Sequence, residues 1–214
     1  MRQLWYLLAL LLAIFLLWDF PLFYPLKILV VFFHESSHAL ATLLTGGSVK
    51  EMVIQPQAGG HVISLGGNRA ITLTAGYLGS LLWGVCIYLL AITSNRDRGI
   101  MMSLGGVLIV ITLIYISNSF AFFFGLITGA VMIASGKWLS MKINDFILRV
   151  IGLTSMMYVP LDIYSDTILR SHLRSDARMF AEEFGGATVI WGTIWIAISL
   201  LVIYRCLKWS LKRQ

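Results

Sequence analysis

The sequence predicts an all-α polytopic membrane protein with six or seven transmembrane helices and one short β-hairpin. Of its 214 residues, 58% are hydrophobic and only 12% are charged, whereas a soluble domain carries about 25% charged residues. The apolar residues form long runs, and a helix needs roughly 20 of them to cross a bilayer. One segment, 46–69, interrupts these runs with glycine, proline and β-branched residues.

The predicted spans share a long apolar run with polar or aromatic ends, and they are 4–18, 26–45, 70–93, 100–117, 119–135, 146–169 and 187–206. Trp5 and Trp18 lie at the two ends of the first run, as aromatic residues do at membrane interfaces. No small-residue cleavage pattern follows this run, so we expect a retained span and not a signal peptide. We also expect one integral membrane domain over residues 1–214, because the sequence has no internal repeat and no separate soluble segment.

Two of these runs make the number of spans ambiguous. Only three residues, Ser117-Asn118-Ser119, separate 100–117 from 119–135, so the two form a tight hairpin or are partly re-entrant. The run 146–169 contains Pro160 and two aspartates, which is unusual for a helix that faces lipid. Six or seven crossings are therefore compatible with the pattern.

The segment between the second and third spans predicts the hairpin. Two β-branched runs, 52–54 and 62–64, flank a turn that is rich in proline and glycine. Non-helical backbone at membrane depth requires protein or a water-filled cavity to satisfy it. The hairpin is therefore either the wall of a cavity beside the preceding helix or an ordinary loop outside the membrane.

The net charge of +6 comes from basic residues in short loops and near the C-terminus, where they set membrane orientation. We therefore expect the lipid bilayer as a partner, and no nucleic acid. With seven spans, one side would hold Lys27, Arg96, Arg98, Lys137, Lys142, Arg205, Lys208, Lys212 and Arg213, and the other Arg2, Lys50, Arg69, Arg170, Arg174 and Arg178. The first side has the excess of positive charge, which predicts a cytoplasmic C-terminus.

The residues that point to chemistry are His34-Glu35-Ser36-Ser37-His38, inside the second predicted span. Positions four apart lie on one face of a helix, so both imidazoles can bind one Zn²⁺. Glu35 follows the first histidine, where zinc hydrolases place the general base. An ionisable residue in a span costs about 2.5–3.5 kcal/mol on insertion scales, and a bound metal in a wet cavity would compensate three of them. The motif predicts one catalytic zinc per chain.

A catalytic zinc site has three protein ligands, so a third must come from elsewhere. Asp162 is favoured, because it follows Pro160 on a later span, while Asp166 and His61 remain alternatives. At 1.5 Å per residue, His34 lies about 10 Å into its span, whereas Asp162 would lie about 25 Å into its own. This difference in depth argues against the choice unless the later helix is tilted or unwound at its proline, or unless 141–149 forms a separate interfacial helix.

Two other polar segments are weaker candidates. Asn118 is either a turn residue or a hydrogen-bond donor to a developing oxyanion. Ser175-Asp176-Ala177, with Glu182 and Glu183, is typical of a solvated loop or helix start. We assign this second segment no chemistry.

The combination resembles the site-2 protease family of intramembrane zinc metalloproteases, in its short branch without an inserted peptide-binding domain. The resemblance covers roughly residues 26–205 and depends on these stretches: His34 to Ala41, Thr45-Gly46-Gly47, Ala75 to Ser80, and Asp162-Ile163 with Asp166. It implies that His34, His38 and Asp162 bind zinc and that Glu35 is the catalytic acid and base. It also implies a transmembrane protein substrate, whose unwound strand the hairpin could hold by β-addition.

Two functions therefore compete. The first is an intramembrane zinc metalloendopeptidase that cuts transmembrane or membrane-proximal segments. The second is a non-proteolytic membrane protein, either a pseudoprotease or a metal-binding transporter. A transporter would carry polar residues along several spans and a pseudoprotease would not need Glu35, so the pattern favours the enzyme.

Overall fold

The computed structural model describes residues 2–18 and 20–213. It contains eight α-helices, two short helices of other types and two strands among these residues. The elements are α1 (Arg2–Leu16), the 3-10 helix η1 (Pro21–Phe23), α2 (Tyr24–Leu44), β1 (Ser48–Gln55), β2 (Gly59–Leu65), α3 (Arg69–Thr93), α4 (Asp97–Tyr115), α5 (Ser119–Trp138), α6 (Met141–Tyr164), the π-helix η2 (Ser165–Leu169), α7 (Asp176–Phe184) and α8 (Thr188–Arg213). The predicted fold class, a helical multi-pass membrane protein with a hairpin after the second helix, is confirmed.

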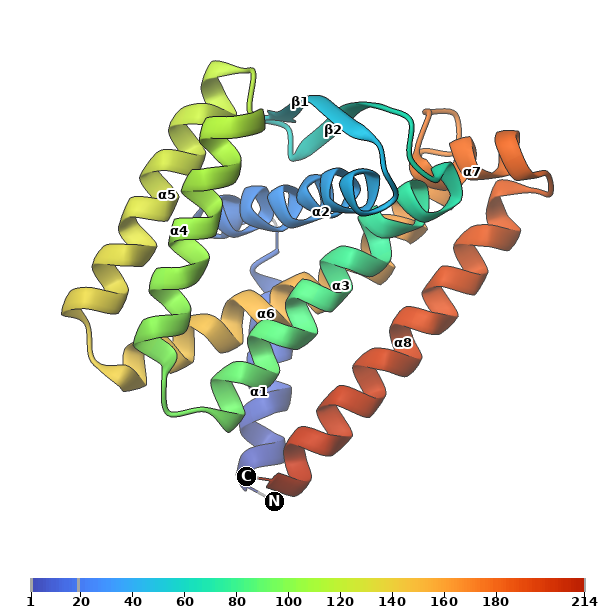
Figure 1. Ribbon diagram of the computed structural model, residues 1–214. Coiled ribbons are helices and arrows are strands. Elements are labelled where there is room, and N and C mark those ends of the chain that lie inside the picture. Colours follow the sequence, from blue (N-terminus) through green and yellow to red (C-terminus); the bar gives the residue numbers. More distant parts are fainter. Residues whose placement is uncertain (1, 19, 214) are drawn as a thin grey trace.

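Five helices are individually long and apolar enough to cross a membrane: α3, α4, α5, α6 extended by η2, and α8. The first two predicted spans behave differently, because α1 and the segment from η1 through α2 form one pair bent by 104°. Counting that pair as one span gives six crossings. Hydropathy predicted both apolar runs correctly, but it could not show that the second run lies at a steep angle to the first (Figure 1).

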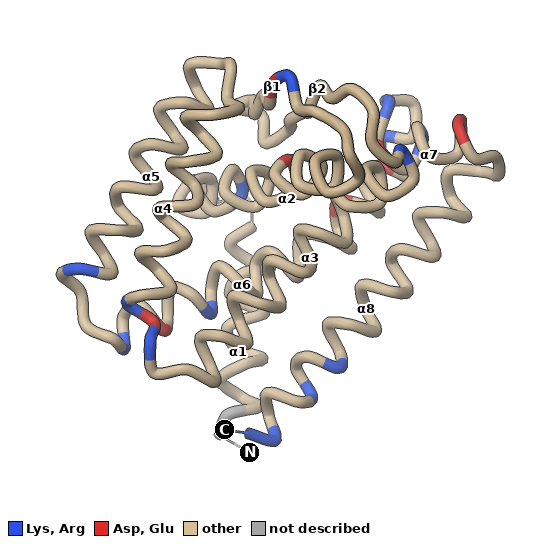
Figure 2. The backbone as a smooth tube through the Cα atoms, viewed as in Figure 1, with Lys and Arg blue, Asp and Glu red and all other residues tan. Residues whose placement is uncertain are grey.

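Six crossings bring the start of α1 and the end of α8 to the same end of the molecule (Figure 1). Leu7 and Leu211 line one small crevice there, which agrees with that arrangement. The prediction that the start of the chain lies opposite its C-terminus is therefore wrong, because it assumed seven separate spans. Basic residues at the end of α8 and the start of α4 mark the terminal end in Figure 2. That this end is cytoplasmic stays a prediction.

The ambiguous runs are regular helices in the structure. α4 and α5 form a tight antiparallel hairpin of two full-length helices, as one of the two interpretations predicted. α6 continues through Pro160 without a break and then passes into the π-helix η2. The alternative of a separate interfacial helix over 141–149 is not found.

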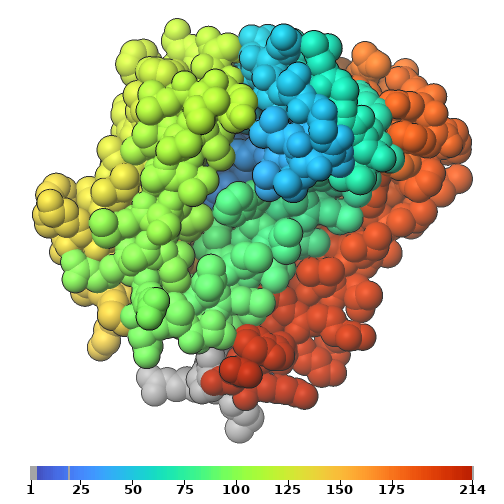
Figure 3. All heavy atoms as spheres, in the orientation of Figure 1, coloured from blue at the N-terminus to red at the C-terminus, as the bar shows by residue number. Residues whose placement is uncertain are grey.

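The helix that carries the motif, α2, lies at the centre of the protein. Every residue from Ile28 to Ala39 on it is buried. The hairpin covers one side of it, and α3 and α6 pack against others (Figure 1). Only a small part of α2 is visible between the hairpin, α3 and α4 in the face shown in Figure 3.

The hairpin has the predicted two strands, with Met52 paired to Val62 and Ile54 to Gly60. Its β1 edge is closed by the turn between α4 and α5. The backbone N–H of Ser117 donates to the Met52 carbonyl at 3.2 Å, and the Asn118 carboxamide bonds to both backbone groups of Ile54, at 3.3 and 2.8 Å. Asn118 is thus a turn residue that completes the edge of a strand, and the hypothesis of an oxyanion donor is not supported.

Candidate metal and catalytic site

A cavity of about 280 Å³ lies between α2, the hairpin and α7, and all the ionisable residues of the motif line it. α2 supplies His34, Glu35 and His38. The hairpin supplies its second strand and turn as a wall, which confirms the cavity interpretation over the ordinary loop. The remaining polar groups come from the start of α3, the end of α6, η2, the loop that follows it and the start of α7.

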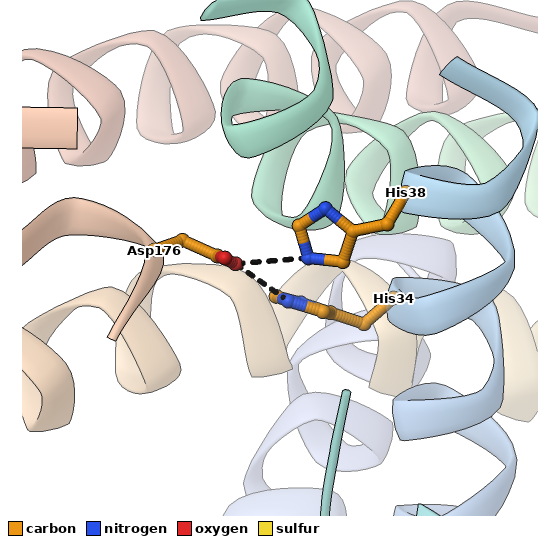
Figure 4. A group of neighbouring side chains, drawn as sticks. All are labelled: His34, His38 and Asp176. Carbon is orange, nitrogen blue, oxygen red and sulfur yellow. Dashed lines mark hydrogen bonds and ion pairs between the residues drawn. The ribbon is translucent and has the colours of Figure 1, made fainter. Parts of the chain in front are cut away.

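The two histidines converge on one carboxylate oxygen (Figure 4). Nε2 of His34 and Nε2 of His38 each lie 3.0 Å from Oδ2 of Asp176. The three ligand atoms lie within 4.8 Å of one another. Tetrahedral zinc with bonds of about 2.0–2.2 Å separates its ligand atoms by roughly 3.3 Å, so the donor set suits the ion and the two nitrogen–oxygen distances lie close to the separation that it requires.

A hydrogen bond fixes the tautomer of one of the two histidines, His38, in the form that can bind a metal through Nε2. Nδ1 of His38 lies 2.7 Å from the Thr72 carbonyl, which can only accept, so Nδ1 carries the hydrogen. A carbonyl or carboxylate partner of this kind fixes the tautomer of most metal-binding histidines. In the neutral ring that would bind a metal, the lone pair of His38 is then on Nε2, the nitrogen that faces Asp176; without a metal, a proton on Nε2 lets the ring donate to that carboxylate.

Asp162 lies on the other side of His34. Its Oδ2 is 3.8 Å from Nδ1 of that ring, the nitrogen that faces away from Asp176. The structure therefore places Asp162 beside the site, and places Asp176 within the group formed by the two Nε2 atoms. The two nitrogens of one imidazole point in different directions and do not bind the same ion.

The two alternative ligands have other surroundings. Asp166 accepts a hydrogen bond of 2.6 Å from the Tyr77 hydroxyl and one of 2.9 Å from Arg170. His61 lines the cavity from β2 but is not a member of the triad of metal-binding atoms that the described residues form.

Asp176 is the residue that sequence reasoning missed. The helix start that was predicted at this position is present, since α7 begins at Asp176 and Ser175 caps it. The side chain is not solvated, however, and only 12% of it is exposed. Burial alone would raise the pKa of its carboxyl, but the charges and hydrogen bonds of His38 and His34 outweigh burial and hold the pKa below its usual range. A carboxylate that stays ionised suits a divalent cation.

Five buried side-chain polar atoms lack a hydrogen-bond partner among the described residues, and two of them are ionisable groups of the motif, namely Nδ1 of His34 and Oε2 of Glu35. An unsatisfied buried polar group costs about 1–3 kcal/mol, so such atoms are expected where a ligand, a water or a proton transfer completes the site. Glu35 is 4% exposed and lines the cavity beside the triad. The residues present thus fit a metal with an adjacent general base.

Two glycines make this arrangement possible. A Cβ atom at Gly76 on α3 would collide with Nε2 of both His34 and His38. A Cβ atom at Gly60 on β2 would lie 2.6 Å from Oε1 of Glu35. α3 and the hairpin can approach the motif helix because these positions have no side chain.

We expect Gly76→Ala to weaken metal binding and to destabilise the protein by about 1–3 kcal/mol, as overpacking of a filled interior does. Chelator competition and thermal unfolding in detergent would measure both effects. The matched control is Gly106→Ala on α4, where an added Cβ has no neighbour within 4 Å. Equal behaviour of the two variants would contradict the packing argument.

The fold and site together define a multi-pass membrane protein with a candidate metallopeptidase centre buried among its helices. A family model described as Peptidase M50B-like matches residues 7–206, and the chain belongs to this family. The resemblance to membrane metallopeptidases of the site-2 protease type is thereby confirmed. A search of curated proteins and a search of solved structures each found no match.

Proposed function

We propose that this protein is an intramembrane zinc metalloendopeptidase that hydrolyses peptide bonds in transmembrane or membrane-proximal segments of other membrane proteins. The observation that carries the proposal is the placement of the buried Glu35 carboxylate, whose Oε2 has no hydrogen-bond partner, beside three converging metal-binding atoms in one cavity. Membership of a peptidase family supports the same reaction class.

In this proposal His34, His38 and Asp176 hold one Zn²⁺, and Asp162 orients His34 through its other ring nitrogen. The sequence favoured Asp162 as the third ligand, but its carboxylate faces Nδ1 of His34 at 3.8 Å. At this distance no hydrogen bond forms, and Nδ1 of His34 has no hydrogen-bond partner among the described residues, so we propose that Asp162 takes the role of outer partner when the His34 ring shifts onto a bound ion. The assignment of Asp176 is supported by its equal distance to both Nε2 atoms.

When bound, the ion supplies a Lewis acid that polarises the peptide carbonyl and acidifies water. Glu35 accepts a proton from the attacking water and returns it to the leaving amine, as a general base and then a general acid. Burial of Glu35 removes competing water from this carboxylate.

The substrate strand is proposed to add to the outer edge of β2. The outer edge of β1 is already occupied by Ser117 and Asn118. Among the described residues, no hydrogen bond joins the outer edge of β2 to another element. Residues of β2 line the cavity next to Glu35. An extended peptide on that edge would gain backbone hydrogen bonds beside the general base.

We expect Gln57→Pro to slow cleavage roughly 10–100-fold without loss of zinc. Gln57 follows Pro56 in the tight turn that the Ala58 N–H closes on the Gln55 carbonyl at 3.1 Å. Proline is disfavoured at the second central position of such a turn, and a misplacement of about 1 Å can cost 10²-fold in rate. Gln57→Ala keeps the turn and is the control. Unchanged cleavage by the proline variant would remove the role of the hairpin.

The competing functions explain less of the site. A metal-binding transporter would distribute polar residues along a path through several spans, whereas the metal-binding group here lies in one cavity that opens between the hairpin and α7. A pseudoprotease would have no use for a buried Glu35 whose Oε2 lacks a hydrogen-bond partner.

The proposed function is tested by two measurements on detergent-purified protein. Elemental analysis should give about one zinc per chain, and a model transmembrane substrate reconstituted with the protein should be cleaved. Absence of zinc after mild purification and zinc reloading would overturn the proposal. Zinc without cleavage of any segment in a library of transmembrane substrates would favour the non-proteolytic alternative.

A further inference from the structure

We propose that Phe180 is a positioning residue for the metal, because it seats α7 and thereby holds Asp176 against the two histidines. This inference depends on the proposed role of Asp176 as a ligand. It adds that the zinc affinity of the protein is set by how firmly α7 docks on the membrane bundle.

α7 carries the one ligand of the triad, Asp176, that has no anchor in the membrane. His34 and His38 belong to the buried α2, whereas α7 has only nine residues. It is followed by Gly185 and Gly186, both with positive φ, at 83° and 85°. Such a short helix is marginal by itself in water, so contacts with the rest of the protein must hold it in place.

One buried side chain, Phe180, makes the ring contacts between α7 and α8. Phe180 is 8% exposed, and its ring centroid lies 4.6 Å from that of Trp191 and 5.2 Å from that of Trp195, both on α8. Trp195 in turn lies 5.4 Å from Tyr77, and Tyr77 lies 5.4 Å from His34. A continuous row of rings therefore joins α7 to the motif helix.

Asp176 and Phe180 are four residues apart and lie on one face of α7. A helix moves as a rigid unit over one turn, so the packing of the Phe180 ring against α8 fixes the position of the Asp176 carboxylate. An ion pair from Arg69 on α3 to Glu183, at 3.1 Å, adds a second attachment. Both of its side chains are more than 40% exposed, and exposed pairs contribute little.

The loss of zinc affinity that a change at Phe180 can cause therefore has an upper limit. If α7 is undocked, the metal site has lost Asp176 and nothing more, so a change at Phe180 can weaken zinc binding at most as much as Asp176→Asn does. The two changes act through the same interaction and must be non-additive. A general destabilisation of the fold would weaken binding in both backgrounds alike.

The experiment measures zinc affinity by chelator competition in the full-length protein in detergent. We expect Phe180→Ala to lower the affinity about 10–100-fold, the usual loss when a residue that supports a ligand is removed. In the Asp176→Asn background the same change should alter it by less than about twofold. Glu182→Gln is the control on α7, since its partners are Arg178 on the same helix and the exposed Arg174 in the preceding loop, and exposed pairs contribute little.

Hydrogen exchange of the α7 amides provides a second readout, with protection by zinc expected in the wild type and lost in Phe180→Ala. If that variant does not fold, Phe180→Leu and the charge exchange Arg69→Glu with Glu183→Arg replace it. Each single reversal should lower the affinity about two- to fivefold, and the double exchange should restore it.

Equal losses in both backgrounds, or α7 amides that stay protected in Phe180→Ala, would overturn the inference. These results differ from a failure of the proposed function. A wild-type protein without zinc contradicts the metallopeptidase itself, and zinc binding that ignores Asp176→Asn contradicts the ligand assignment. An effect of Asp176 without an effect of Phe180 contradicts this inference alone.

Discussion

Glu35→Gln is expected to abolish peptide hydrolysis while the protein keeps its fold and its zinc. Glutamine has the shape of glutamate, so it fills the same buried position on α2 against the hairpin. A carboxamide cannot accept the proton of the attacking water, and general acid–base catalysis by one side chain contributes about 10²–10⁴-fold. Cleavage of a reconstituted transmembrane substrate should therefore fall by at least about 10²-fold.

Three measurements on the same preparation interpret that result. Elemental analysis should still find about one zinc per chain, thermal unfolding should be unchanged within about 1 kcal/mol, and Glu182→Gln on the surface of α7 should cleave like the wild type. Cleavage by Glu35→Gln at an undiminished rate would place the general base elsewhere. Loss of zinc in this variant would instead give Glu35 a role in holding the metal.

The parts of the site that depend on local spacing could be predicted from the sequence. His34 and His38 share a helix face because they are four residues apart, and in the structure their Nε2 atoms lie at the same distance from one carboxylate oxygen. The hairpin also follows from a local signal, two β-branched runs around a turn with proline and glycine. In both cases the partners are close in the chain.

The parts that depend on distant contacts could not be predicted in the same way. Asp176 is 142 residues from His34, and its neighbourhood in the sequence looks like an ordinary capped helix start, with serine before an acidic first turn. The bend of 104° between α1 and the following segment is invisible to hydropathy, because both runs are apolar. Only long-range packing determines these two features.

One signal in the sequence did point away from Asp162. Counting residues along the two predicted spans placed it deeper in the membrane than His34. The structure reduces that difference, because α2 lies across the bundle, yet it leaves Asp162 on the Nδ1 side of the ring. Asp176 lies at the start of α7, after the loop that follows η2, and lines the same cavity.

Asp176→Asn is accordingly expected to have the largest effect on metal binding, larger than Asp162→Asn. An amide oxygen carries no charge, so the change replaces the one anionic ligand of the triad, and zinc affinity should fall by more than about 100-fold. Asp162 is expected to act through His34, and loss of such an outer partner typically costs about 10–100-fold. Chelator competition and elemental analysis on both variants measure these two losses of zinc affinity.

The order of the two effects decides between the two aspartates. A greater loss in Asp162→Asn would restore the assignment that the resemblance implies, and would require the His34 ring to turn so that Nδ1 binds the ion. A greater loss in Asp176→Asn means that the third ligand lies outside the membrane spans, on a helix held by ring contacts with α8. In that case the catalytic centre is complete only when α7 closes over α2, because one helix carries the general base and two ligands and the other carries the third.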